Sequence, residues 1–131
     1  MLRLIATFSL LAGLSLFGQA SRGAWWNGPT IRALNLSPDQ MRQMRAAIQQ
    51  YRPHLQELRA NVQAAEWQLE QEFDRDPVDP QRTNAAIEHL VAARSELTRT
   101  LSQMGLRLRM ILTLQQWREV QRQFPRRAQG G

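Results

Sequence analysis

Two long stretches of this chain place apolar residues in alternating steps of three and four, and this spacing restricts the fold more than any other feature. The first ladder comprises Met41, Met44, Ile48, Tyr51, Leu55, Leu58, Val62, Ala65 and Leu69. The second comprises Ile87, Leu90, Arg94, Leu97, Leu101, Met104, Leu108 and Ile111. Such steps keep side chains on one face of a helix and are typical of helices that pack on other helices. The sequence therefore predicts an all-α fold built on two long helices.

The segment between the ladders, residues 74–80, predicts the turn of a hairpin. It contains two Asp-Pro pairs, which disfavour helix at the residue before each proline. Asp79 is a good N-cap residue, and Pro80 suits the first position of the next helix.

Folding the two ladders antiparallel about this turn matches them residue by residue. Leu69 then lies opposite Leu90, and the polar Arg94 lies opposite the small Ala65, which leaves room for its stem to reach solvent. We expect an antiparallel αα-hairpin roughly 45 Å long. Pro53 lies inside the first ladder and should kink or split that helix, because it removes a backbone donor and crowds the preceding turn.

A short motif precedes each of two expected helices, one before the hairpin and one after it. In each copy a hydroxyl residue can cap the helix, and a glutamine three positions later can bond back to the backbone N–H of the cap residue. The leucine before each cap can pack against the residue that follows the glutamine. The second copy predicts a last helix from Leu114 to about Phe124, ended by Pro125. The motif residues are Leu36, Ser37 and Gln40 in the first copy and Leu112, Thr113 and Gln116 in the second.

The first twenty residues have the layout of a secretory signal peptide. Arg3 carries positive charge, Leu4 to Phe17 form an uncharged apolar run, and Gly18 and Ala20 are small residues suited to cleavage. The run is shorter than the ~20 residues that a membrane span needs. We therefore expect export to the periplasm, with an uncleaved membrane anchor as the less favoured alternative. The expected organisation is a signal peptide (1–20), a flexible lead-in (21–35), a hairpin domain (36–124) and a disordered tail (125–131).

Aromatic residues outside the ladders suggest further contacts. Trp25 and Trp26 in the lead-in either fold back on the domain or contact a partner, and at a membrane surface they could serve as anchors. Trp67 lies on the outer face of the hairpin, away from the other ladder. A two-helix hairpin without cysteine buries little apolar surface, and small all-helical chains often complete their core by dimerising. The sequence therefore predicts a homodimer.

The motifs around the hairpin resemble those of the LTxxQ-motif family, over roughly residues 34–124. The resemblance rests on Leu-Asn-Leu-Ser-Pro-Asp-Gln at 34–40, where serine replaces the motif threonine, and on Ile-Leu-Thr-Leu-Gln-Gln-Trp at 111–117. That family contains the Spy and CpxP periplasmic stress proteins and the related periplasmic heavy-metal sensors and zinc-resistance proteins. The resemblance implies an all-α cradle made by two hairpins in an antiparallel dimer. In Spy-like members the concave face holds unfolded or partly folded clients without ATP. Metal-sensing members instead bind a transition metal, and an envelope-stress or metal-response regulator is a further partner class.

The charge pattern favours the chaperone branch. The chain has a net charge of +6, and its seventeen basic residues are all arginine. A basic surface interleaved with apolar groups can attract acidic, partly unfolded chains and then hold them by burial. The alternative is an ordinary solvated face, in which glutamates balance the arginines. The expected client-binding residues are Arg45, Arg52, Arg59, Trp67, Arg107 and Arg109.

Transition-metal binding is the alternative function, and its ligand set is thin. The chain has two histidines, His54 and His89, which the hairpin would place ~24 Å apart, so that they cannot share an ion within one chain. Met104 fits the ladder and is expected in the core rather than as a ligand. A metal site would need His54 with methionine ligands across a dimer.

Other function classes lack their motifs. The sequence has no Gly-rich phosphate loop, no cysteine nucleophile, no Ser-His-acid set and no HExxH, so we do not expect an enzyme. Nucleic acid is not an expected partner of an exported chain. The expectation is therefore a protein-binding or metal-binding protein with no other cofactor.

Overall fold

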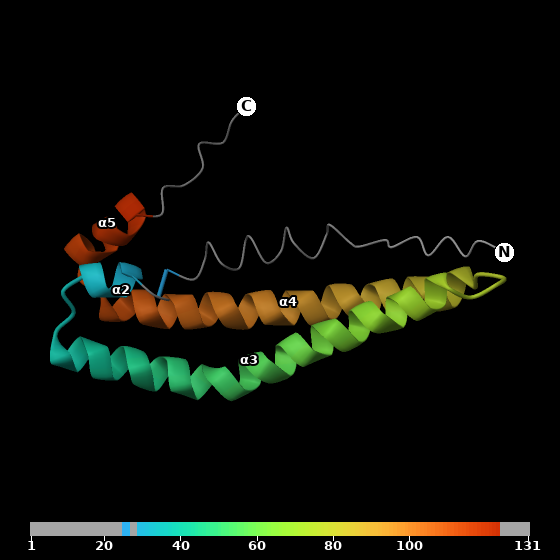
Figure 1. Ribbon diagram of the computed structural model, residues 1–131, viewed down its shortest axis with the longest axis horizontal. Coiled ribbons are helices and arrows are strands. Elements are labelled where there is room, and N and C mark those ends of the chain that lie inside the picture. The colour runs from blue at the N-terminus through green and yellow to red at the C-terminus, as the bar shows by residue number, and fades with distance from the viewer. Residues whose placement is uncertain (1–24, 27–28, 124–131) are drawn as a thin grey trace, which may run out of the picture. The chain divides into compact units, whose positions relative to one another are not determined.

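The computed structural model describes residues 25–26 and 29–123, and this part of the chain contains helices and no strand (Figure 1). The helices are α2 (Pro29–Ala33), α3 (Pro38–Phe73), α4 (Pro80–Ile111) and α5 (Leu114–Gln123). The expected signal peptide and C-terminal tail lie outside the described residues. None of the described helices is long and apolar enough to cross a membrane.

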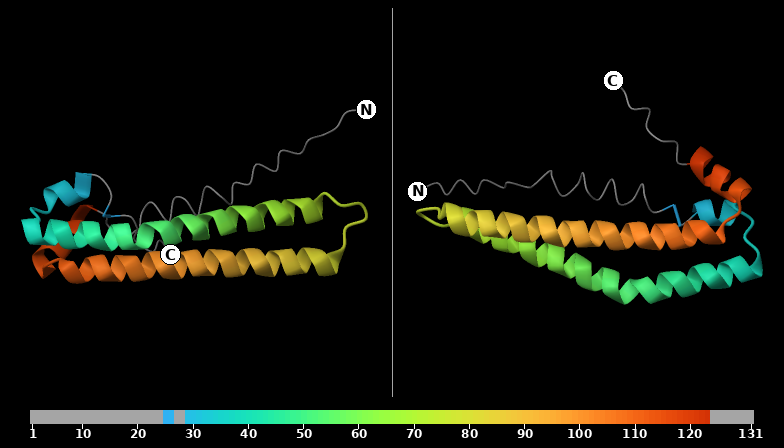
Figure 2. Two further views of the ribbon diagram at one scale, coloured as in Figure 1. Left: turned by 90° about the horizontal axis from the view of Figure 1, so that it is seen from below. Right: turned by 180° about the vertical axis from the view of Figure 1, so that it is seen from behind.

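The chain divides into two compact units. The first is the hairpin Pro38–Ile111, in which α3 and α4 run antiparallel and side by side (Figures 1 and 2). The second combines the segment before Pro38 with the segment from Leu112 onward, and it contains α2 and α5. The predicted all-α fold, a long hairpin with a short terminal helix, is confirmed.

Hydrogen bonds between α3 and α4 give the register of the hairpin. Arg94 Nη2 donates to Glu66 Oε1 at 2.9 Å, and Glu66 is the neighbour of Ala65, the predicted partner of Arg94. His89 Nδ1 lies 2.9 Å from Gln68 Oε1, whereas the ladders place Glu70, two residues further along α3, opposite His89. The apolar periodicity therefore predicts the register to within two residues.

The predicted ladder positions are buried or half-buried in the hairpin, with one correction near the turn. Met44, Leu55, Leu58, Ala65, Leu90, Met104 and Leu108 are buried, as predicted. Ile87, predicted to be in the core, is 36% exposed. Thr83 is buried instead, and its hydroxyl donates to the carbonyl of Asp79 at 2.7 Å. Because this bond satisfies the hydroxyl, Thr83 can be buried, and it extends the second ladder toward the turn by one step of four before Ile87.

Pro53 bends α3 without dividing it. The helix continues from Pro38 to Phe73 with Pro53 inside it, and Figure 1 and the right-hand view of Figure 2 show that α3 is bent. Of the two predicted outcomes, a kink rather than a split is therefore the one observed. The predicted turn is also present: Asp79 Oδ1 accepts hydrogen bonds from the backbone N–H groups of Gln81 at 3.0 Å and Arg82 at 3.2 Å, which is the expected N-cap of α4.

The second unit is organised by tryptophan. Trp25 and Trp26 are buried, and their rings meet edge to face with centroids 5.7 Å apart. Trp25 makes the same kind of contact with Trp117 of α5, also at 5.7 Å. The lead-in tryptophans therefore fold back on their own chain, which was one of the two alternatives that the sequence left open. Asn35, with a φ of 50°, follows α2 in the left-handed conformation that asparagine tolerates at helix ends.

Candidate functional site

The second LTxxQ-type motif forms the predicted capping box. The backbone N–H of Gln116 donates to Thr113 Oγ1 at 3.2 Å, and the backbone N–H of Thr113 donates to Gln116 Oε1 at 2.9 Å. Leu112, before the cap, is buried. Two of the N–H groups that a helix start leaves without partners are thus satisfied reciprocally.

Each motif glutamine also donates to a distant carbonyl, which the sequence does not indicate. Gln116 Nε2 donates to the carbonyl of Leu34, just after α2, at 3.3 Å. Gln40 Nε2 donates to the carbonyl of Ile111, the last residue of α4, at 3.0 Å. Carbonyls at helix ends lack intrahelical partners. The glutamine of this motif therefore serves a helix end elsewhere in the same unit, and Ser37 as a cap of α3 remains a prediction.

One long edge of the hairpin carries both histidines. Arg107 of α4 hydrogen-bonds Gln50 Oε1 across the hairpin, just as His89 meets Gln68. Gln50 and Gln68 are about five helical turns apart and so lie on the same edge of α3. His54, Glu57 and Asn61 lie between them, near the same edge by the helical period. We call this surface the histidine face: Gln43, Gln50, His54, Glu57, Asn61 and Gln68 of α3 with His89 and Arg107 of α4.

The opposite edge carries three of the predicted client-binding arginines, which form a stripe along α3. It is marked by the ion pair between Glu66 and Arg94, and steps of seven residues back from Glu66 reach Arg59, Arg52 and Arg45. These three arginines are exposed, and none pairs with an acidic side chain within the described part of the chain. By contrast, Arg42, Arg75, Arg82, Arg99 and Arg122 each form an ion pair. The stripe is therefore a row of cations without a counter-charge among these residues.

Exposed apolar side chains continue this edge toward the turn. Phe73 follows Glu66 by two turns, and Ile87 and Val91 lie one turn apart on α4, with Ile87 two turns before Arg94. Phe73 and Val91 are each more than half exposed. We call the combined surface the arginine face: Arg45, Arg52, Arg59, Phe73, Ile87 and Val91.

The structure divides the predicted client-binding residues between the two edges. Arg107 lies on the histidine face, bonded to Gln50. Arg109 is half-buried, and the helical period places it toward the arginine face. Trp67 is 61% exposed, as predicted, and lines a shallow hollow near the turn. The residues thus do not form one continuous patch.

The predicted metal ligands do not converge within one chain. Met104 is 3% exposed and belongs to the core, the more favoured of its two predicted roles. His89 faces Gln68, whereas His54 Nδ1 lies 3.7 Å from Glu57 Oε2 with side chains 52% and 70% exposed. Residues 25–26 and 29–123 contain no group of three or more His, Cys, Asp or Glu side chains that could hold a metal ion. One chain therefore offers a half-site, His54 with Glu57, rather than a complete site.

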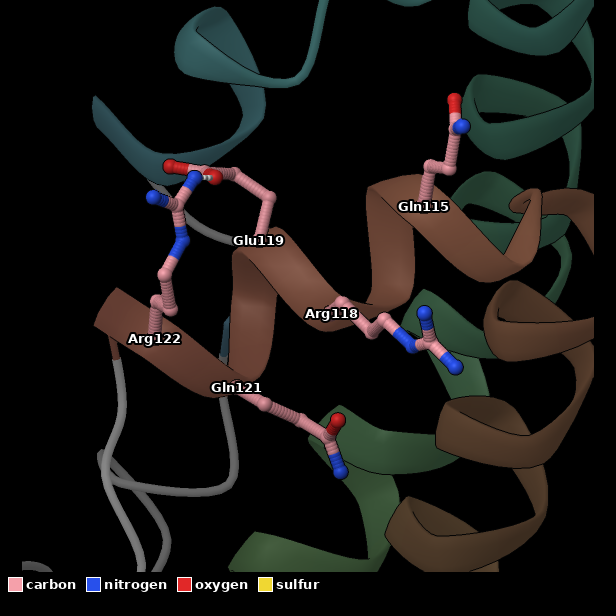
Figure 3. A pocket seen from close by; sticks show the side chains of 5 residues that line it. All are labelled: Gln115, Arg118, Glu119, Gln121 and Arg122. Carbon is pink, nitrogen blue, oxygen red and sulfur yellow. Dashed lines mark ion pairs between the residues drawn. The ribbon is translucent and has the colours of Figure 1, made fainter.

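An open hollow runs along α5 in the second unit and is lined by Gln115, Arg118, Glu119, Gln121 and Arg122 (Figure 3). Glu119 forms an ion pair with Arg122, and Arg118 and Gln121 point away from that pair (Figure 3). All five residues come from one ten-residue helix. The hollow is therefore a stretch of helix surface rather than an enclosed cavity.

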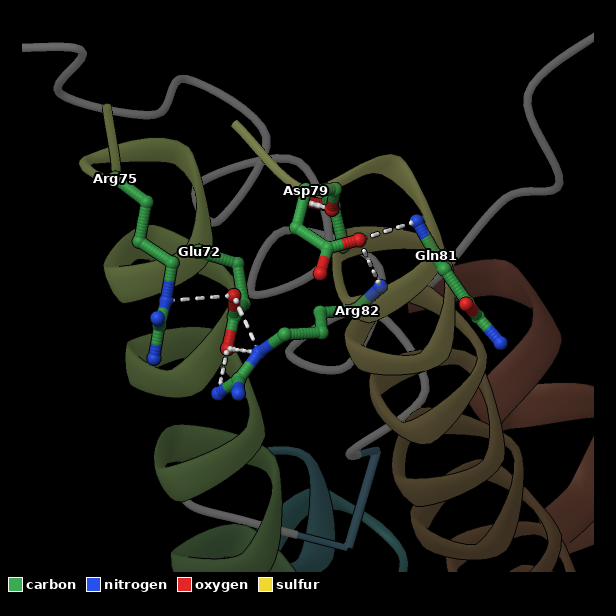
Figure 4. A network of polar contacts seen from close by, with 6 residues as sticks. Glu72, Arg75, Asp79, Gln81 and Arg82 are labelled. Atoms are coloured by element: carbon green, nitrogen blue, oxygen red, sulfur yellow. Dashed lines mark hydrogen bonds and ion pairs between the residues drawn. The ribbon is translucent and has the colours of Figure 1, made fainter. Parts of the chain in front are cut away.

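The hollow near the turn contains charges that already compensate one another. Glu72 lies between Arg75, at 3.0 Å, and Arg82, at 3.1 Å (Figure 4). The hydrogen bond to Glu72 and the negative charge of that carboxylate raise the pKa of Arg82 above its ordinary value. Trp67 and His89 line the same hollow. The network links the end of α3 to the turn and to the first turn of α4.

Comparison with known proteins identifies the branch of the resemblance. A family model described as heavy-metal resistance matches residues 4–119. No curated protein and no solved structure matches the chain. The match agrees with the LTxxQ resemblance and favours the metal-resistance branch over the chaperone branch, which the charge pattern had favoured. Since the match covers most of the sequence, the chain belongs to the heavy-metal resistance family.

Proposed function

We propose that this protein acts in heavy-metal resistance outside the cytoplasm by binding a transition-metal ion. The observation that carries the proposal is the family match across residues 4–119. The exposed half-site supports it, because the imidazole of His54 and the carboxylate of Glu57 lie 3.7 Å apart on one edge of α3. Imidazole suits zinc, copper and nickel. The signal-peptide pattern of residues 1–20 supports a periplasmic location.

Calorimetry with zinc, nickel, cobalt and copper ions on the purified protein tests this function. We expect at least one ion to bind at micromolar concentration or below, with affinity falling as the pH drops, because imidazole must be neutral to act as a ligand. Cells that produce the protein should also tolerate more of that ion than cells that produce a His54→Ala variant. Failure of all four ions to bind would contradict the proposal.

A second function, holding partly unfolded protein, is favoured by the composition of the arginine face. Three arginines without ion-pair partners share an edge with the exposed Phe73 and Val91. Unpaired charges can steer an acidic chain to the surface, and exposed apolar groups can then hold it. Such an activity suits metal stress, in which other proteins are damaged. The client would be acidic and at least partly unfolded.

A pair of matched triple variants tests client binding. Replacing Arg45, Arg52 and Arg59 with Gln should slow association with a denatured acidic protein and weaken suppression of its aggregation. The effect should fade at high salt, because exposed charges are screened over ~8 Å at physiological ionic strength. The control replaces Arg42, Arg99 and Arg122 with Gln, which removes the same charge from arginines that are already paired. Equal loss in both variants would show that net charge, and not the arginine face, attracts the client.

A further inference from the structure

The histidine face of α3 is complementary to itself when two copies run antiparallel. Consider a two-fold axis beside α3, level with the midpoint between His54 and Glu57. This axis sets His54 of one copy opposite Glu57 of the other. The same axis sets Gln50 opposite Asn61, so amides meet amides. Gln43 of one copy lies opposite Gln68 of the other at both ends of the histidine face, and both side chains are exposed. Such a self-matching patch is what an isologous two-fold interface requires.

The arginine face does not have this property. An antiparallel two-fold arrangement centred on Arg52 would set Arg52 against its own copy and Arg45 against Arg59. Like charges placed opposite one another are destabilising. None of the three has an acidic partner among the described residues, so that part of each chain does not itself neutralise these charges. A second copy is therefore directed to the histidine face.

The side chains that flank the histidine face permit a close approach. Ala46 and Ala64 are exposed and small, and they lie one turn before Gln50 and one turn before Gln68. Trp67, 61% exposed in one chain, lies beside Gln68, and the two-fold axis brings it next to Ala46 of the second copy. The pairing would thus cover the largest exposed aromatic side chain of the hairpin, which a single chain leaves in solvent.

We infer that two copies join along the histidine face and hold one transition-metal ion between them, through His54 and Glu57 of each chain. This inference rests on the metal-binding function proposed above and assigns its ligands. Histidine and glutamate three positions apart lie on one face of a helix, a spacing that helical bundles use for metal ligands. Two such pairs supply two imidazoles and two carboxylates, which is the four-ligand count of a tetrahedral zinc site. The second copy therefore completes a site that one chain cannot form.

Zinc titration of the purified protein, followed by calorimetry and sedimentation velocity, tests the shared site. We expect one zinc ion per two chains, bound to a dimer. Added chelator should remove the ion from that dimer. His54→Ala and Glu57→Gln should each weaken zinc binding at least ~10-fold, since even outer-shell partners of metal ligands are worth that much. Glu70→Gln is the matched control for Glu57→Gln, because this exposed glutamate lies outside the histidine face and should leave zinc binding unchanged. Circular dichroism should show native helicity in all variants.

The outcomes separate the shared site from the proposed function. Zinc bound at one ion per chain, or binding that survives His54→Ala, overturns the shared site and leaves metal binding in place. Loss of zinc binding in His89→Ala with retention in His54→Ala likewise assigns the ion to another place. No binding of zinc, nickel, cobalt or copper by the native protein overturns both the shared site and the proposed function.

Discussion

Replacing Gln116 with Glu separates the effects of two hydrogen bonds of this side chain in the α2–α5 unit. Its Oε1 accepts from the backbone N–H of Thr113 at 2.9 Å, and its Nε2 donates to the carbonyl of Leu34 at 3.3 Å. A glutamate keeps the acceptor and adds a charge that the N-terminus of α5 favours. It has no hydrogen to donate to Leu34, which is buried. The variant should therefore keep the start of α5 and lose its tie to Leu34.

The magnitude follows from these two bonds. A neutral hydrogen bond contributes about 0.5–1.5 kcal/mol, and a buried carbonyl left without a donor costs about 1–3 kcal/mol. We expect Gln116→Glu to lower the free energy of unfolding of this unit by ~1–2 kcal/mol. Gln116→Ala, which removes both bonds, should lower it by ~2–3 kcal/mol. For a domain of this size 1 kcal/mol shifts Tm by about 3–5 °C.

Thermal melting followed by near-ultraviolet circular dichroism measures the effect. The edge-to-face contact of Trp25 with Trp117 lies in the same unit, so that the tryptophan signal should report loosening there. Gln115→Glu is the control, because it adds the same charge to the first turn of α5 at an exposed position. If Gln116→Glu melted like Gln115→Glu with an unchanged tryptophan signal, the bond to Leu34 would contribute nothing and the reasoning would be refuted.

Three further substitutions test other parts of the structure. Thr113→Ala should destabilise α5 by ~1 kcal/mol through loss of its cap, whereas Thr113→Ser should not, which thermal melting would show. Glu72→Gln removes the charge that pairs with Arg75 and Arg82. Amide hydrogen exchange in residues 74–80 should therefore become faster, while exchange in α5 should not change. Pro53→Ala should straighten α3 and raise Tm, because a proline inside a helix costs ~3 kcal/mol; an unchanged or lower Tm would show that packing has adapted to the bend.

The hairpin was predictable because its information is local and periodic. Steps of three and four define one apolar face on each helix. Arg94 pairs with Glu66, which is next to Ala65, the residue predicted to lie opposite Arg94. The cap of α4 by Asp79 follows from residue type and position alone. The exception lies near the turn, where Ile87 is partly exposed and Thr83, which is outside the predicted ladder, is buried. Thr83 can be buried because its hydroxyl bonds to the carbonyl of Asp79, and the apolar periodicity does not predict such a bond.

The candidate site was less predictable because its contacts join residues far apart in the sequence. The amide of Gln116 reaches Leu34, and a carbonyl at the end of another helix leaves no pattern near the glutamine. Arg107 and Arg109 flank the same leucine, yet Arg107 bonds Gln50 on the histidine face. Adjacency in the sequence therefore does not indicate which edge of a helix a charge occupies; the cross-hairpin bonds do.

The two faces can act together, because they lie on opposite edges of α3, and this gives a last prediction. A dimer joined along the histidine face would leave two arginine faces open, one on each copy. A client long enough to reach both would bind with avidity, and half an equivalent of zinc should then strengthen its binding by at least ~10-fold. A short acidic peptide, which reaches one face alone, should gain nothing. Fluorescence anisotropy with both ligands measures the difference.

His54→Ala serves as the matched variant for this prediction. It should abolish the effect of zinc on the long client and leave zinc-free affinity unchanged, because His54 lies on the edge of α3 opposite the arginine stripe. Equal strengthening of the short peptide by zinc would mean that the ion acts on the arginine face itself, by changing its charge or conformation. Weaker client binding in zinc would mean that the second copy covers the arginine face. Either result would contradict the assignment of separate roles to the two edges of the hairpin.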